Sequence, residues 1–167
     1  MRQLFLFILI LSGLILLSCS YEPGEALPKN YRTVYVAGFL NDTSEQEFPI
    51  LLSDSVKRAL SEEGTLVVTS QLDKTDLLIA VRIGKYTKNI LTYDPISGLP
   101  DEIFLGVEIK LVVQDVHTKE ILRSQIIEDS VTYTLITEPR QTDIDAKNEL
   151  VNQLTEKITL SAIKGFY

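Results

Sequence analysis

The most constraining feature of the sequence is a regular run in which every second residue from Ile103 to Val113 is aliphatic. This period of two is typical of a β-strand with one buried face, and charged residues at the intervening positions indicate that the other face meets solvent. We therefore expect a sheet covered on one side only. Its central strand should point Val107, Ile109 and Leu111 into the core.

Other segments complete the expected fold. Strands are predicted over residues 33–39, 66–68, 77–83 and 121–134, with a slip in alternation at Ile126–Ile127 that predicts a β-bulge. A helix is predicted over residues 49–63, because Pro49 suits a first turn and Gly64 suits the left-handed position after the last turn. A second helix is expected from Thr142 to near the end of the chain.

The order β-α-β-β-β-β-α places the chain in the α+β class. We expect a single mixed β-sheet of about four to five strands, with a parallel pair formed by the first β-α-β unit. Two amphipathic helices should pack on one face and leave the other face open to a partner.

Residues 85–102 show no clear periodicity and are predicted to form a long loop. A connection of this length is more often functional than merely connecting. Lys85, Lys88 and Tyr93 lie in this segment. Its apolar side chains are expected to act as interface anchors.

The N-terminus carries an export signal. Residues 4–17 are almost entirely apolar, which suits a signal-peptide core but is too short for a membrane-spanning helix. The run ends at Leu16-Leu17-Ser18-Cys19, which resembles the lipobox of bacterial lipoproteins. Cys19 is the only cysteine, so no intrachain disulfide can form. We expect residues 1–18 to be removed, Cys19 to be acylated, residues 19–31 to form a tether and residues 32–167 to form one domain.

Several function classes are excluded by composition. A net charge of −7 argues against nucleic acid as a partner. His117 is the only histidine and sits in a charged turn, so neither a zinc site nor a histidine-activated nucleophile has enough residues. No glycine-rich phosphate loop occurs. The sequence predicts a binding protein without cofactor or metal, and not an enzyme.

Four motifs follow one another along the chain: the lipobox Cys19, the run VYVAGFLNDT at residues 34–43, the run TDLLIAVRI at residues 75–83, and the hairpin at residues 115–122. Their order and spacing resemble the LptE family of lipopolysaccharide-assembly lipoproteins. The likeness covers nearly the whole mature chain, although each motif alone is degenerate.

This resemblance implies a lipoprotein in the periplasmic leaflet of the outer membrane that plugs the lumen of an LptD-like β-barrel and assists lipopolysaccharide transport. On that view Lys85, Lys88, Tyr93 and Arg140 are candidate contacts to the barrel or to lipopolysaccharide. Whether the chain binds lipopolysaccharide directly stays open, because the protein is acidic overall.

A second interpretation rests on the same strand-helix-strand start. The spacing from Val34 to Thr43 is also similar to lipoproteins of the LpoB type, which activate peptidoglycan synthases, and of the CsgG type, which form secretion pores. The short tether favours work close to the membrane, and therefore the LptE-like role.

Overall fold

A computed structural model describes residues 31–135 and 139–163, with the side chains of the last helix described from Thr142 onward. The expected signal peptide and the acylation site at Cys19 lie outside these residues. The elements are β1 (Thr33–Val36), β2 (Leu40–Asn41), α2 (Phe48–Glu63), β3 (Val67–Val68), the short helix η1 (Leu72–Lys74), β4 (Leu77–Tyr93), β5 (Pro100–Asp115), β6 (Ile121–Thr134) and α3 (Pro139–Ile163).

All strands belong to one mixed sheet in the order β3-β1-β4-β5-β6, with the short β2 also paired to β4. Strand β1 pairs in parallel with β3 and with β4, which confirms the expected β-α-β unit. Strands β4, β5 and β6 form an antiparallel meander of three long strands, called here the ribbon. The α+β prediction is confirmed, with six strands in place of four to five.

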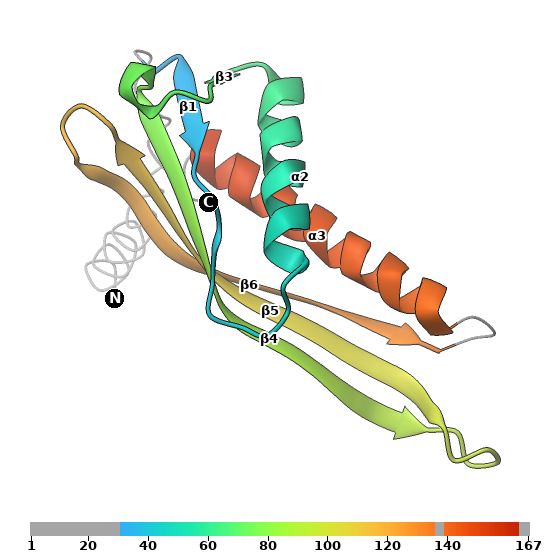
Figure 1. The fold of residues 1–167 in the computed structure, drawn as a ribbon. Coiled ribbons are helices and arrows are strands. Elements are labelled where there is room, and N and C mark those ends of the chain that lie inside the picture. The colour runs from blue at the N-terminus through green and yellow to red at the C-terminus, as the bar shows by residue number, and fades with distance from the viewer. Residues whose placement is uncertain (1–30, 136–138, 164–167) are drawn as a thin grey trace, which may run out of the picture.

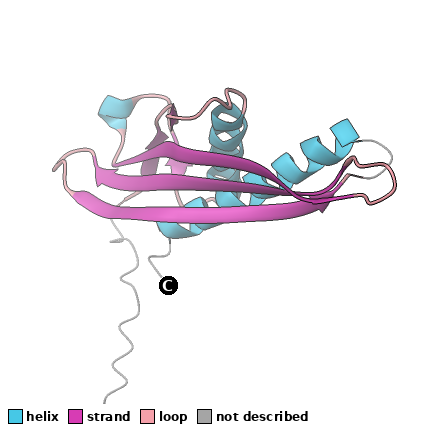
Figure 2. Ribbon diagram, turned by 90° about the horizontal axis from the view of Figure 1, so that it is seen from below, coloured by secondary structure: helices cyan, strands magenta, loops and turns pink. Residues whose placement is uncertain are grey.

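Helices α2 and α3 cover the same face of the sheet, and no described element covers the opposite face, called here the bare face (Figures 1 and 2). Helix α2 begins with a proline in its first turn and ends at Gly64, whose φ of 77° is the left-handed conformation predicted for it. The first turn of α3 begins at Pro139, earlier than the predicted Thr142. Proline is favoured at this position because the first helical N–H groups have no partner within the helix.

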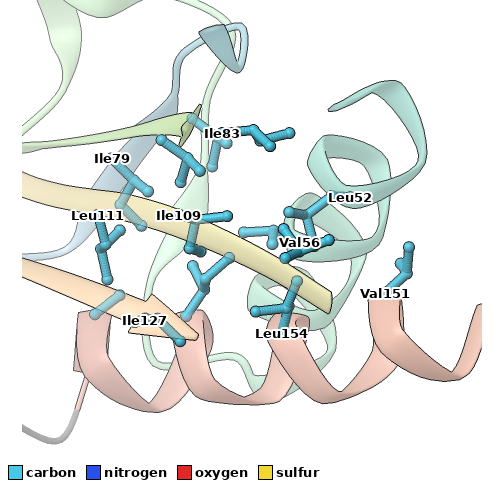
Figure 3. Close-up of a cluster of buried hydrophobic side chains, with 14 of the residues drawn as sticks. Leu52, Val56, Ile79, Ile83, Ile109, Leu111, Ile127, Val151 and Leu154 are labelled. Carbon is cyan, nitrogen blue, oxygen red and sulfur yellow. The ribbon is translucent and has the colours of Figure 1, made fainter. Parts of the chain in front are cut away.

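The core lies between the helices and the covered face of the sheet. Val107, Ile109 and Leu111 are all buried, as the alternation predicted. They meet Leu52 and Val56 of α2 and Leu154 of α3 within one cluster of apolar side chains (Figure 3). Burial of these large side chains is the main favourable contribution to folding.

The predicted loop at residues 85–102 is wrong. Strand β4 continues to Tyr93 and β5 begins at Pro100, so the connecting turn spans only residues 94–99. A one-residue irregularity between Ile83 and Lys85 shifts the phase of β4, and the inward positions that follow include a lysine. Both effects remove the regular alternation by which a strand is recognised.

The predicted bulge at Ile126–Ile127 is also wrong. The register of β5 and β6 is regular there, with Ile127 buried and Ile126 exposed on the bare face. The irregularity lies instead between Val113 and Gln114. In the sequence, the exposed Ile126 therefore interrupts the alternation of apolar and polar residues in the same way as a bulge would.

Candidate interaction surface on the ribbon

The outer parts of β4 and β5 form a hairpin, which we call the arm and define as residues 85–108, and the far end of the arm extends beyond the helices (Figure 1). Within the described chain, β4 pairs with β1 and β2 only as far as Ile83, whose carbonyl accepts the N–H of Asp42 at 3.0 Å. Past this point one edge of the arm meets no described strand. The arm thus offers a partner its bare face, one edge and a tip.

The tip, residues 94–99, is a tightly bonded turn. The Asp94 carboxylate accepts the N–H groups of Ile96 at 3.1 Å and Ser97 at 2.6 Å, and also the Ser97 hydroxyl at 2.7 Å. The N–H of Asp94 donates to the carbonyl of Leu99 at 2.9 Å, and Gly98 takes a φ of 70°. Hydrogen bonds from Ser97 and Ile96 hold the pKa of Asp94 below its usual value. The turn therefore has a defined shape that holds Ile96 outward.

The inner face of the arm is joined to α3 by a polar cluster. The Asp143 carboxylate accepts hydrogen bonds from both Lys88 and Tyr133. Burial disfavours the charged form of Asp143, but these two bonds and the positive charges of Lys88 and Lys147 together outweigh burial, so its pKa lies below the usual value. Burial, reinforced by the bond to Asp143, raises the pKa of Tyr133 well above its usual value. The cluster fixes the base of the arm against the start of α3.

Two further contacts support the same junction. Lys147 of α3 pairs with Glu45, in the segment before α2, at 2.8 Å. The ring of Tyr86 packs edge-on against Phe48 with centroids 5.6 Å apart. Burial raises the pKa of Tyr86 as well, and the nearby carboxylates of Glu45 and Asp143 act in the same direction. The inner face near the helices is therefore already occupied by the protein's own side chains.

The bare face of the arm carries a shallow hollow of about 300 Å³. Its floor is Gly106, where a Cβ would stand 2.7 Å from the Phe104 ring. Glu108 lies opposite Lys85 on one side and opposite Glu128 on the other. Facing carboxylates are unfavourable on a sheet surface, so this row holds charges that a partner could neutralise.

The edge of the ribbon at β6 is protected at its middle. The N–H of Leu135 donates to the carbonyl of Asp101 in β5. Backbone groups alternate in direction along a strand, so the odd-numbered residues of β6 bond to β5 and the even-numbered residues direct their backbone groups away from the sheet. Lys157 donates to the Glu128 carbonyl at 3.3 Å, and Asp129 accepts the N–H of Ser130 at 3.0 Å. Lys157 also pairs with Asp129 at 2.8 Å. Side chains thus occupy the groups that an added strand would use.

The residues predicted as contacts are not brought together. Lys85 lies on the bare face, whereas Lys88 lies on the inner face and is paired with Asp143. Tyr93 ends β4 beside the tip and is exposed. Arg140 belongs to the first turn of α3, and its side chain lies outside the described residues.

Sequence reasoning counted Ile96 among the apolar side chains of this segment but chose the lysines and Tyr93 as candidate contacts, and it did not single out Leu99. The structure places Ile96 and Leu99 at the tip, where both are exposed. The available signal was the near absence of charge between Asn89 and Pro100, where Asp94 is the single charged residue.

The only histidine, His117, is exposed and lies 3.7 Å from Asp76, whose other carboxylate oxygen accepts the Thr33 hydroxyl at 2.8 Å. Asp76 itself accepts hydrogen bonds from the N–H groups of Arg32 and Thr33 and so holds the start of β1. Among the described residues, no group of acidic, histidine or cysteine side chains is placed to bind a metal ion. None of the described helices is long and apolar enough to cross a bilayer.

Neither a protein-family model nor a curated protein matches the chain. Solved structures do match it. A protein from Xanthomonas campestris aligns with a TM-score of 0.58 at 14% identity, over 84% of this chain and 89% of that one. An uncharacterised lipoprotein B from Nitrosomonas europaea aligns with a TM-score of 0.53 at 17% identity, over 78% and 83%. PelC of Paraburkholderia phytofirmans, described as a dodecamer, aligns with a TM-score of 0.52 at 15% identity, over 86% and 96%. At these identities the likeness shows a shared fold, one that bacterial lipoproteins also adopt.

Proposed function

We propose that this protein is a non-catalytic lipoprotein of the outer membrane. Acylated at Cys19 and held in the periplasmic leaflet, it binds and plugs an LptD-like β-barrel and assists the transport of lipopolysaccharide. The lipobox, the ordered motifs of the LptE family and a fold shared with bacterial lipoproteins all support this role.

The observation that carries the proposal is the arm. The two-stranded end of β4 and β5 continues past both helices and ends in an apolar turn that no described element covers (Figure 1). Exposed apolar surface of this kind marks an interaction site more often than a solvated surface. A scaffold that presents such a ribbon, and no chemistry, suits a partner-binding role.

The test is purification of the lipidated protein in mild detergent, followed by identification of co-purifying outer-membrane proteins. The wild-type chain is expected to recover an LptD-like barrel. A variant with residues 91–102 replaced by a short Gly-Ser linker removes the part of the arm beyond the Ile90–Ile103 pair. It should fold but lose most of the barrel.

A matched control replaces residues 118–120 in the hairpin at the opposite end of the ribbon, and should keep the barrel. Recovery of a peptidoglycan synthase, or equal recovery of the barrel by both variants, would contradict the proposal for the arm.

Within this proposal, Lys85 is a better candidate than Lys88 for direct contact with the phosphates of lipopolysaccharide. Lys85 is on the bare face, while Lys88 would have to give up Asp143 to reach an anion. Lys85→Glu should weaken lipopolysaccharide binding by the purified protein several-fold, and Lys119→Glu, an exposed lysine in the opposite hairpin, should leave it unchanged.

The alternative role, in a secretion complex or as an activator of a peptidoglycan synthase, has one point in its favour. The chain shares its fold with PelC, which is described as a dodecamer. Sedimentation of the lipidated protein in detergent separates the two roles, since a ring-forming protein would sediment as an assembly of many copies.

A further inference from the structure

The apolar side chains of the arm gather at its far end. Ile96 is 95% exposed, Leu99 65%, Tyr93 58% and Leu91 51%. Exposed large apolar residues elsewhere in the ribbon, such as Ile126, stand among polar neighbours. Exposed apolar residues are therefore concentrated at the tip, whereas the others are the scattered residues common on any protein.

The tip also lacks the charges that would oppose transfer to hydrocarbon. Asp94 is the one charged residue between Asn89 and Pro100. Its carboxylate is engaged by the N–H groups of the turn and points back into the loop. Tyr93 adds an aromatic ring with a polar end, a residue type enriched where membranes meet water.

The shape of the tip favours insertion over adsorption. Because the hydrogen bonds of the turn fix the backbone, Ile96 and Leu99 are already held outward and lose little freedom when they are buried. The nearest charges at the base of the tip, Asp101 and Glu102, are acidic, so attraction to anionic headgroups does not explain binding here.

The chain's own anchor brings a bilayer within reach. Strand β1, which follows the tether, pairs with the first residues of β4, so the tether and the tip lie at opposite ends of β4. Strand β4 has 17 residues and is about 55 Å long at the usual rise. The tether from Cys19 to Tyr31 can extend roughly 40 Å. A domain on such a tether can lie along its membrane or turn its tip toward it.

We propose that the tip of the arm inserts into the lipid bilayer that carries the anchor, burying Tyr93, Ile96 and Leu99 among the acyl chains. This gives the protein a second membrane contact, far from the first, and fixes the direction of the ribbon relative to the membrane. The inference uses the acylation of Cys19 from the proposed function but requires no barrel. A barrel that takes up the tip competes with the bilayer for the same side chains.

The absence of tryptophan from the chain makes the test direct. Ile96→Trp places a single tryptophan, which can be excited apart from the seven tyrosines, at the tip of the full lipidated protein. The protein is reconstituted in vesicles of phosphatidylethanolamine and phosphatidylglycerol without other proteins. Its emission is expected to move to shorter wavelength and to be quenched several-fold more by lipids brominated on their acyl chains than that of Ile126→Trp, the matched exposed position on the bare face.

A second variant separates insertion by the protein from partition of the new indole ring. Leu99→Asp in the Ile96→Trp background should reduce quenching to the level of the control, because a carboxylate is costly in hydrocarbon. High salt should leave quenching unchanged, since insertion is not driven by charge.

Equal quenching at Ile96→Trp and Ile126→Trp overturns the proposal, as does quenching that survives Leu99→Asp or disappears in salt. Because no barrel is present, any of these results leaves the detergent test of barrel binding unaffected. Circular dichroism and the urea midpoint confirm that each variant is folded.

Discussion

The two halves of strand β4 pair with β5 along the same ladder, yet they meet different surroundings. In the first half, Leu77, Ile79 and Val81 point toward the helices and are almost fully buried. In the second half, the equivalent positions after the shift in register are Tyr86, Lys88 and Ile90, and none of them is fully buried. Backbone pairing thus continues well past the point where the core ends.

The two halves are therefore stabilised by different interactions. The covered half is stabilised mainly by burial of apolar area, while the arm depends on its hydrogen-bonded ladder and on the polar cluster at its base. A substitution should therefore cost much in the covered half and progressively less toward the tip. The predictions below measure that gradient.

The largest effect is expected in the core beneath the helices. Ile109→Ala and Leu154→Ala each remove a fully buried side chain from the interface of sheet and helix. Each should lower the free energy of unfolding by about 2–5 kcal/mol, as buried large-to-small changes do. The measurement is urea denaturation followed by circular dichroism. An unchanged midpoint in both variants would contradict the packing of α3 on β5.

A smaller effect is expected at Gly106 in the arm. Its Cβ would meet the Phe104 ring at 2.7 Å, so Gly106→Ala must displace that ring. We expect a loss of about 1–3 kcal/mol, typical of overpacking. In a Phe104→Ala background the same change should become neutral or stabilising, because alanine loses less backbone entropy than glycine in a strand. A double-mutant cycle checks this, and an unchanged cost in that background would contradict the contact.

The polar cluster of Lys88, Tyr133 and Asp143 at the base of the arm should affect how stability depends on pH. Tyr133→Phe removes the hydrogen bond to Asp143 and should cost about 1–2 kcal/mol at neutral pH. The folded-state pKa of Tyr133 is raised above its unfolded value near 10. Its contribution is therefore complete below pH 10 and is lost as the pH rises through the folded-state value.

The difference in free energy of unfolding between wild type and Tyr133→Phe should accordingly narrow above pH 10, and urea midpoints measured across an alkaline series check this. If that difference stays constant with pH, the pKa of the phenol is not raised in the folded state.

The same gradient explains which parts of the structure the sequence predicted. Where one face is covered, as at Val107, Ile109 and Leu111, burial selects apolar residues at every second position, and the strand is evident. Gly64 was equally clear because its left-handed φ is a local requirement. Both signals arise from constraints that act within a few residues.

The arm was missed because no such constraint shaped it. Lys88 points inward, and its partner Asp143 is distant in sequence, so no local pattern marks the position as a strand residue. The predicted grouping of Lys85 and Lys88 failed for the same reason, because the register shift after Ile83 places the two lysines on opposite faces. Only the fold reveals that Ile96 ends a rigid projection instead of a flexible loop.

The smallest effect on stability is expected at the tip. Ile96→Ser removes the most exposed large hydrophobic side chain of the described residues, which is 95% exposed. Surface changes of this kind usually stay within about 0.5 kcal/mol, so the urea midpoint should match that of the wild type. The backbone of the turn is held by Asp94 and does not depend on the isoleucine. A clear loss of stability would mean that the tip folds back on its own domain, and would remove the basis for both its barrel-binding and its lipid-inserting roles.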